Sequence, residues 1–311
     1  MNKILVSGLI NIETTLQIEH FPLNYFPVTY PFHGIQTTVS GVGFNLVKAL
    51  KILGSQTNFL SLIGEDLYKN MIMEELAKLR IDQKFILPIL THTAQSIILY
   101  DLQGRRQIHV DLKDIQEQSF PLDLFNQATM DCELCVLCNI NFNRHLLKPA
   151  KNTKTLVATD VHAIHQVDDP YNRDFMSAAD ILFLSNENLE QNPQDFIREM
   201  WDTYQNKIIV IGMGEQGAML GLQQENLILH IPAIQLHPIV NTIGAGDALF
   251  SSFLFTYTKT GDPIKSLQHA VLFASQKIGF NGAANGFIPF SELVVLFSHH
   301  QNELHPRVIK T

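Results

Sequence analysis

The stretch NTIGAGDALFSSFL, residues 241–254, places three small residues and a carboxylate directly before an apolar run. Gly244, Ala245 and Gly246 allow a tight turn, and the run that follows is apolar nearly all round, which predicts a buried helix. The N-terminus of such a helix points into the protein, where its backbone N–H groups attract an anion. Asp247 falls in the first helical turn, where a carboxylate either caps the helix or takes a proton from a hydroxyl group. An anion site beside a carboxylate is typical of phosphoryl transfer.

The composition of the 311-residue chain is that of a globular protein: 46% of the residues are hydrophobic and 17% are charged. A formal net charge of -8 without a Lys and Arg cluster argues against nucleic acid as a partner. No segment approaches the ~20 apolar residues of a membrane span, and the N-terminus resembles a buried strand more than a signal peptide. We therefore expect a cytoplasmic protein with no membrane partner. Cys132, Cys135 and Cys138 are expected to be buried thiols, since no further metal-ligand pair lies near them.

Alternating strand and helix patterns predict an α/β fold. Short runs that are apolar on both faces suit central parallel strands, and helical patterns at 44–54 and 67–80 lie between them. We expect a doubly wound, mostly parallel sheet flanked by helices. The predicted strands are KILVSGLI from Lys3, TNFLSLIG from Thr57, CELCVLCNI from Cys132, KTLVATDV from Lys154, DILFLSN from Asp180 and KIIVIGMG from Lys207.

Two segments break this rhythm and predict a separate small β-sheet. The segment after Ile12 is rich in β-branched and aromatic residues, and residues 94–110 resemble a hairpin that turns at Gln103 and Gly104. Such a sheet would form a lid over the carboxyl ends of the parallel strands, where open α/β sheets bind ligands. Its open edge favours pairing of two lids in a homodimer. The predicted domains are an α/β domain of residues 1–10, 40–92 and 111–311 and a β lid of residues 11–39 and 93–110.

The segment GMGEQG, residues 212–217, has the glycine spacing of a dinucleotide-binding loop but not its context. That loop requires a helix directly after it, because the helix N-terminus holds the pyrophosphate. Residues 218–232 instead predict two strands around a polar turn, and no acidic residue lies about twenty positions on to hold a ribose. We therefore expect no Rossmann site, and the sequence contains no GK[ST] of a Walker A loop.

Three motifs resemble those of the ribokinase family, the PfkB-type carbohydrate kinases. NTIGAGDALFSS resembles the family's DTxGAGD signature, and residues 40–54 are similar to its GGxxxN signature with a helix that ends in Leu-Gly. LIGEDLYKN resembles the GxDxxG segment, with Lys69 where the second Gly is usual. The resemblance covers nearly the whole chain. It implies a ribokinase-like fold and an ATP-dependent kinase that phosphorylates a hydroxymethyl group of a sugar or nucleoside, with Mg²⁺ bound beside ATP.

The resemblance also implies roles for individual residues. Asp247 would activate the substrate hydroxyl as a base, and Gly244, Ala245 and Gly246 would form the anion hole. The residues that would contact the substrate are Asn11, Glu13, Gly41 and Asn45. Those that would lie beside the nucleotide are Asn186, Gly214, Gly217, Asn281, Gly282 and Ala283.

Several positions depart from the family pattern. Asn241 replaces the Asp associated with a monovalent cation, and because its amide brings no charge, dependence on K⁺ stays open. The NxxE motif that organises magnesium is imperfect: Asn186 is followed by Glu187 and Glu190, either of which could serve if the loop shifts by one residue. Glu190 is taken as the candidate ligand, and solvated acids at a helix start are the equal alternative. Glu13 replaces Asp and would reshape the sugar pocket. Val42 and Phe44 make the first signature more apolar, which keeps a nucleoside substrate open.

Two alternative functions stay open, one suggested by basic side chains outside these motifs and one by the altered motif positions. Arg105 and Arg106 at the hairpin tip could bind a phosphate on the substrate, as in a kinase of phosphosugars, although exposure is the favoured interpretation. The altered positions could also belong to a catalytically silent, ligand-binding member of the family. His162 and His165 are interpreted as loop residues and not as a metal site.

Overall fold

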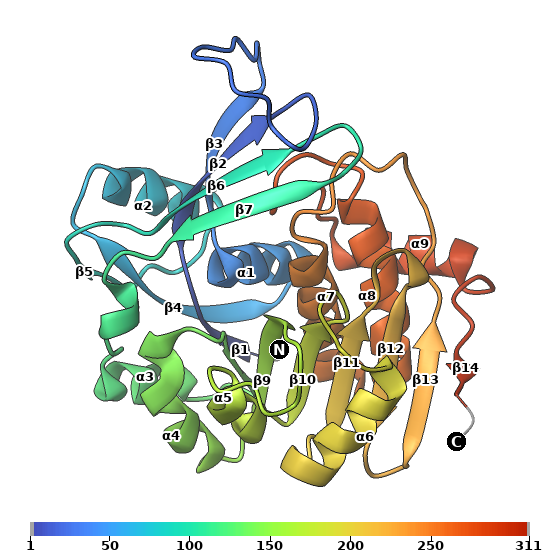
Figure 1. Ribbon diagram of the computed structural model, residues 1–311. Coiled ribbons are helices and arrows are strands. Elements are labelled where there is room, and N and C mark those ends of the chain that lie inside the picture. The colour runs from blue at the N-terminus through green and yellow to red at the C-terminus, as the bar shows by residue number, and fades with distance from the viewer. Residues whose placement is uncertain (1–2, 310–311) are drawn as a thin grey trace.

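A ten-stranded sheet crosses the middle of this computed structural model, which describes residues 3–309 (Figure 1). The predicted domain ends 1–2 and 310–311 lie outside the described residues. The strands are β1 (Lys3–Ser7), β4 (Gln56–Gly64), β5 (Ile86–Leu90), β8 (Leu134–Leu137), β9 (Leu156–Ala163), β10 (Ile181–Ser185), β11 (Ile208–Gly212), β12 (Ala218–Leu222), β13 (Leu227–Ile231) and β14 (Arg307–Val308). Their order is β14-β13-β12-β11-β10-β9-β8-β1-β4-β5. The strands from β11 to β5 pair in parallel, and β12, β13 and β14 extend the sheet through antiparallel pairs, so the predicted mostly parallel sheet is confirmed.

Helices cover both faces of this sheet. One face carries α1 (Val42–Leu53), α2 (Tyr68–Lys78), α7 (Ala245–Thr260), α8 (Pro263–Lys277) and α9 (Phe290–His300). The other carries α3 (Leu122–Thr129), α4 (Leu147–Lys151), α5 (Arg173–Ala178) and α6 (Pro193–Tyr204), which lie in front in Figure 1. Because side chains alternate along a strand, Ile4 and Val6 of β1 pack on the first face and Leu5 packs on the second. Within residues 3–309, no helix is long and apolar enough to span a membrane.

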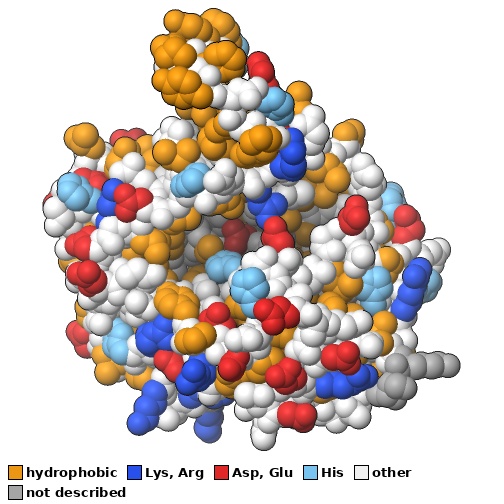
Figure 2. Space-filling view, viewed as in Figure 1, with side chains coloured by type: hydrophobic (Ala, Val, Ile, Leu, Met, Phe, Trp, Pro, Cys, Tyr) orange, Lys and Arg blue, Asp and Glu red, His pale blue; other side chains and the backbone are white. Residues whose placement is uncertain are grey.

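A four-stranded sheet stands apart at the top of Figure 1. It consists of β2 (Asn11–Gln17), β3 (Ile35–Ser40), β6 (Gln95–Tyr100) and β7 (Arg106–Asp111), in the order β3-β2-β6-β7. The predicted hairpin is confirmed: β6 pairs antiparallel with β7, and Gly104 in their turn has a left-handed φ of 81°. The loop of residues 18–34 projects from this small sheet, and Figure 2 shows hydrophobic side chains gathered on the projection. Its most exposed apolar residues are Tyr25, Tyr30 and Phe32.

The predictions for GMGEQG and for the cysteines agree with the structure. After β11, Gly214–Gln216 form a single 3₁₀ turn, and β12 and β13 follow without an intervening helix, as the sequence predicts. Gly217 closes the turn with a φ of 96°, and a Cβ there would lie 2.1 Å from the carbonyl oxygen of Ile231. Cys132, Cys135 and Cys138 are buried free thiols.

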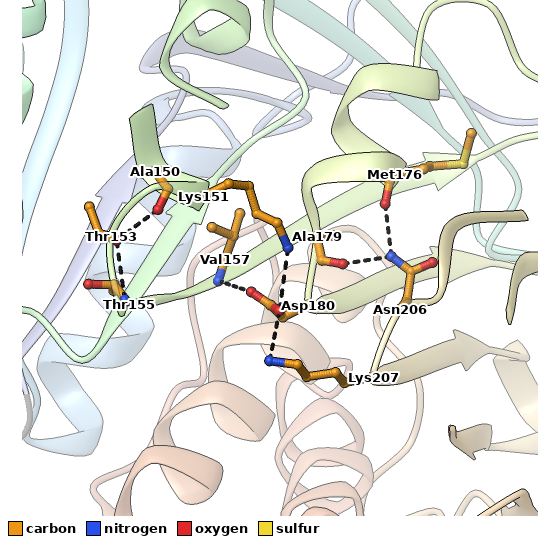
Figure 3. A network of polar contacts seen from close by, with 10 residues as sticks. All are labelled: Ala150, Lys151, Thr153, Thr155, Val157, Met176, Ala179, Asp180, Asn206 and Lys207. Carbon is orange, nitrogen blue, oxygen red and sulfur yellow. Dashed lines mark hydrogen bonds and ion pairs between the residues drawn. The ribbon is translucent and has the colours of Figure 1, made fainter. Parts of the chain in front are cut away.

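A polar network holds the amino ends of β9, β10 and β11 (Figure 3). Asp180 accepts a hydrogen bond from the Val157 N–H at 2.9 Å, and its Oδ1 lies 3.0 Å from Lys207 Nζ and 3.5 Å from Lys151 Nζ. Burial alone would raise the pKa of Asp180, but the Val157 N–H and the two lysines hold it below its usual value. Asn206 donates two further hydrogen bonds, of 2.8 and 2.7 Å, to carbonyl groups at the end of α5. This end of the sheet is built for stability, whereas ligands of open α/β sheets bind at the carboxyl ends.

Candidate active site

The N-termini of α1 and α7 meet, and this contact forms the centre of the candidate site. Asn45 in the first turn of α1 donates a hydrogen bond of 2.7 Å to Asp247 Oδ2 in the first turn of α7, across 202 positions of sequence. Gly41 precedes α1 with a φ of 105°, and a Cβ there would lie 2.5 Å from the carbonyl oxygen of Leu9. Gly244 precedes α7 with a φ of 77°, and its Cβ would lie 2.0 Å from the carbonyl oxygen of Ala283. Both helix starts therefore require glycine.

The Asp247 carboxyl group has the electrostatics of a base at neutral pH. Burial raises the pKa of Asp247 to about 6, against the hydrogen bond from Asn45 and the nearby charges of His162 and Lys277, which lower it. Asp160, whose Oδ2 lies 4.0 Å from His162 Nδ1, raises it further. A carboxyl group with this pKa is mostly ionised at pH 7 and can still take up a proton easily.

The start of α7 has the geometry of an anion site. Gly244 caps the helix, and no side chain in the described part of the chain caps its first turn. Gly246 is exposed, and a Cβ built on it would meet nothing within 4 Å. The Ala245 N–H donates to the carbonyl oxygen of Thr242 at 3.2 Å. The backbone at Gly246 lies beside open space, and an anion could approach this helix start there.

The predicted substrate residues of β2 carry unsatisfied hydrogen-bond acceptors. Asn11 Nδ2 donates to Ser96 Oγ at 2.9 Å, and Ser40 Oγ donates to Glu13 Oε2 at 2.9 Å and lies 3.4 Å from Asn45 Oδ1. The remaining oxygens, Asn11 Oδ1 and Glu13 Oε1, are buried and have no hydrogen-bond partner within residues 3–309. Buried acceptors are rarely left unpaired, so these two oxygens are suited to hydroxyl donors of a ligand. Burial also raises the pKa of the Glu13 carboxyl, although Ser40 and the charge of Lys277 oppose this.

Sequence reasoning missed Ser40 and Ser96, and it also missed Lys277. The two serines lie on β3 and β6, at positions in register with Asn11 and Glu13. Lys277, at the end of α8, is completely buried, and burial lowers the pKa of its ammonium group to about 8. The available signal was weak: Lys277 directly precedes the glycine loop of residues 278–286, but the buried side of its helix also carries other polar residues, such as His269 and Gln276.

The structure brings the loop before α7 against the loop of the predicted adenine site. Asn241 is buried, and its Nδ2 donates to Asn281 Oδ1 at 3.1 Å. Gly282 has a φ of 80°, and Ala283 packs against Gly244. The predicted cation residue Asn241 and the predicted anion-hole residue Gly244 therefore lie against the predicted nucleotide loop of residues 281–283.

The other predicted nucleotide and magnesium residues lie along the ends of β10 and β11. The Asn186 N–H donates to the carbonyl oxygen of Gly212 at 2.9 Å, which places Asn186 beside the strand end that leads to Gly214. Glu190 is exposed, and its N–H donates to the carbonyl oxygen of His165 at 3.2 Å. Both side chains are accessible to solvent. Within residues 3–309, no hydrogen bond or ion pair joins them.

Arg105 and Arg106 are exposed, as expected, but Arg106 also joins the small sheet to the main domain. Its guanidinium donates to Thr242 Oγ1 and lies 3.9 Å from Glu187 Oε2. Arg105 Nε donates to Asp101 Oδ2 at 2.8 Å. Figure 2 shows the surface hollowed below the small sheet. An open cavity of about 520 Å³ borders the hairpin tip, lined by Phe21, Gly104, Arg105, Arg106, Gln107 and Glu187.

One argument for an aromatic substrate is wrong. The apolar character of Val42 and Phe44 was the reason to consider a nucleoside as the substrate. In the structure, however, Phe44 is completely buried in the core and Val42 packs against the same cluster. Their side chains are apolar because they fill the space between α1 and the sheet, and they carry no information about a ligand.

Comparison with known proteins gives consistent matches. A profile of the pfkB family of carbohydrate kinases matches residues 1–290. The acarbose 7(IV)-phosphotransferase of Actinoplanes sp. is 25% identical over 268 residues, which cover 85% of this chain and 87% of that protein. The ribokinase of Dictyostelium discoideum is 23% identical over 323 residues, covering 94% and 99% of the two chains. The structure of a microbiome-derived acarbose kinase superposes with a TM-score of 0.86 at 22% identity, covering 96% of this chain and 99% of that one.

Proposed function

The chain belongs to the pfkB family of carbohydrate kinases, and from this premise we propose that Asp247 and the start of α7 phosphorylate a hydroxymethyl group. The enzyme is an ATP-dependent kinase of a carbohydrate or nucleoside. The observation that carries the proposal is the Asp247 carboxylate, fixed by Asn45 at 2.7 Å beside the uncapped N-terminus of α7. Phosphoryl transfer is catalysed mainly by positioning and charge stabilisation, and this arrangement supplies both.

Asp247 acts as the general base in this proposal. Asn45 occupies Asp247 Oδ2 and leaves Oδ1 to accept the proton of the substrate hydroxyl. The hydroxyl oxygen then forms a bond to the γ-phosphorus of ATP, the bond from that phosphorus to the β,γ-bridging oxygen breaks, and ADP leaves with the released electron pair. The backbone N–H groups at Gly244 and Gly246 stabilise the charge on the transferring group, for which the open space at Gly246 leaves room. The Ala245 N–H would join them by giving up its bond to the carbonyl oxygen of Thr242.

A sugar is the proposed substrate. The free acceptors Asn11 Oδ1 and Glu13 Oε1 match the hydroxyl groups of a polyhydroxylated ring. Gly41 lets the backbone approach this region, and Ser40 and Ser96 hold the two acceptors in place. The small sheet that carries these residues would serve as a lid that excludes water, and Arg106 would hold it closed through Thr242 and Glu187. Pairing of two small sheets in a homodimer remains part of this proposal.

The nucleotide would lie along the surface formed by Gly214, Gly217 and the loop Asn281–Ala283. The donor set at the end of β10 fits Mg²⁺, which prefers oxygen ligands and typically needs only one or two carboxylates when it arrives with substrate phosphates. Asn186 and Glu190 would hold it, and their side chains are accessible at that edge. When bound, magnesium would neutralise charge on the phosphates.

A kinase of phosphosugars is the second candidate, because two arginines border the cavity at the hairpin tip. Arg105 and Arg106 are both engaged by carboxylates, so a substrate phosphate would have to compete with Asp101 and Glu187. This competition favours the unphosphorylated sugar.

The test is ATP consumption with a panel of pentoses, hexoses, oligosaccharides, nucleosides and sugar phosphates in the presence of magnesium. We expect substrate-dependent turnover that Asp247→Asn lowers by roughly 100- to 10,000-fold, the scale of general-base catalysis. Asp131→Asn is the matched control, since it makes the same change at an exposed position. A wild-type rate in Asp247→Asn would refute the assigned base. ATP binding without turnover of any compound would support the silent family member.

A further inference from the structure

Lys277 is a buried cation whose ammonium group faces neutral oxygens. Its side chain is completely buried, and Nζ lies 3.4 Å from Asn241 Oδ1 and 3.5 Å from the carbonyl oxygen of Phe280. Within residues 3–309 it makes no ion pair with a carboxylate, although Asp247 and Glu13 are near enough to act on its charge. Burying a charge in this way is costly unless its position is needed.

The oxygens around Lys277 are those that a monovalent metal ion would use. The family resemblance places a monovalent cation at Asn241, so the fit of such an ion can be judged from the contacts there. Asn241 Nδ2 donates to Asn281, so its Oδ1 faces the other way, where it accepts from the Ile243 N–H at 3.2 Å and from Lys277. A metal ion at this oxygen would meet the ammonium group at close range, and Asn241 offers no negative charge to offset the repulsion. The residues therefore do not fit K⁺.

We propose that the Lys277 ammonium group replaces a monovalent metal ion in this kinase, which makes catalysis independent of added K⁺. The inference rests on the proposed kinase function. Lys277 acts as a positioning residue, because its two oxygen contacts lie on two different loops. Through Asn241 and the Ile243 N–H it holds the turn that leads to Gly244, and through Phe280 it holds the loop whose Ala283 packs on Gly244.

A covalently attached cation differs from a bound one in a measurable way. A bound ion holds the loops only while its concentration exceeds its dissociation constant, and it stabilises the folded state by mass action. The Lys277 ammonium is present in every molecule. Neither the rate nor the thermal stability of the wild-type protein should therefore respond specifically to K⁺.

The first experiment compares the wild-type protein in K⁺ and in tetramethylammonium at equal ionic strength, which keeps general screening constant. We expect the same kcat/KM for the sugar and the same thermal unfolding midpoint in both salts. Strong activation by K⁺, or a midpoint raised by K⁺ alone, would overturn the proposal. If no sugar is turned over, the proposed function fails, and the unfolding midpoints still decide whether the protein binds K⁺.

The second experiment removes the ammonium group of Lys277 and supplies K⁺ in solution instead. Lys277→Met should lower kcat by roughly 100-fold, the scale for displacing a catalytic group by about 1 Å, with a smaller effect on KM. The double variant Lys277→Ala with Asn241→Asp opens a space beside a carboxylate, so K⁺ should both restore its rate and raise its unfolding midpoint. Lys265→Met, at an exposed position of the same helix, is the control and should resemble the wild type. A double variant that folds without responding to K⁺ would contradict the assigned geometry, and if it does not fold, the wild-type comparison decides.

Discussion

Replacing Asn45 by leucine tests the electrostatics of the proposed base. Asn45 Nδ2 donates to Asp247 Oδ2 at 2.7 Å, a short hydrogen bond to a charged group, and it lowers the pKa of a carboxyl that burial raises to about 6. The hydrogen bond stabilises the ionised form, so its removal must raise the pKa of Asp247 further. Leucine keeps the approximate size of the side chain while removing the donor.

The magnitude follows from the strength of that hydrogen bond. A hydrogen bond to a charged group contributes roughly 1.5 to 3 kcal/mol, and a change of one pH unit in pKa corresponds to about 1.36 kcal/mol. The acid limb of the pH–rate profile, expected near the Asp247 pKa of about 6 in the wild type, should therefore move up by roughly 1 to 2 pH units in Asn45→Leu. At neutral pH the variant should have a large fraction of its base protonated.

The assay is kcat/KM for the sugar as a function of pH at saturating ATP, because this parameter reports the ionisation of the enzyme before the sugar binds. The position of the limb carries the result, and a loss of sugar affinity would lower the whole profile without moving it. Ser96→Ala is the control: it disturbs the Asn11 contact and so the substrate side, and its limb should stay at the wild-type pH. A limb in Asn45→Leu that stays in place or moves to lower pH would refute the reasoning.

Three further predictions concern the anion site, the polar network and the small sheet. Gly246→Ala should not lower the unfolding midpoint and should raise it slightly, because its methyl group meets no atom within 4 Å and alanine favours the helix. It should nevertheless lower kcat/KM by roughly 100-fold by filling the phosphoryl site; equal rates would contradict the anion hole. Asp180→Ala should lower the free energy of unfolding at pH 7 by roughly 1.5 to 3 kcal/mol in urea titrations. Since the folded pKa of Asp180 is depressed, its contribution is present above the unfolded pKa and is lost as pH falls through the folded value, so the two proteins should converge in acid. Arg106→Gln should raise KM for the sugar more than it lowers kcat, and unchanged kinetics would show that its contacts with Thr242 and Glu187 do not hold the sheet.

The sequence predicts the elements of this fold because each one is encoded locally. The runs that became β1, β4, β8, β9, β10 and β11 are apolar on both faces, which marks central parallel strands. The helix after Asp247 is apolar nearly all round and is buried as α7. Gly41 and Gly244 stand where their positive φ angles require glycine, so their place in the motifs has a structural cause besides the proposed functional one.

The sequence does not predict contacts between distant elements. Ser40 and Ser96 reach Glu13 and Asn11 because β3 and β6 flank β2 in the small sheet. The sequence of a single strand does not predict which strands will be its neighbours. Lys277 resembles an ordinary basic residue at a helix C-terminus, where lysine is favoured anyway. Its burial becomes visible only when α8 is packed against α7 and the two loops close over the ammonium group.

The small sheet consists of two continuous segments, residues 11–40 and 95–111, each entering and leaving the main domain at adjacent strand and helix ends. Asn11, Glu13, Ser40 and Ser96 lie on these segments, whereas Asp247 and the turn before α7 belong to the main domain. In the proposed function, specificity and chemistry are thus carried by separate stretches of the chain. Grafting the two segments from a relative, as a pair, would exchange the sugar preference and keep the phosphoryl-transfer machinery of the recipient. Recombination within the family could proceed by the same route.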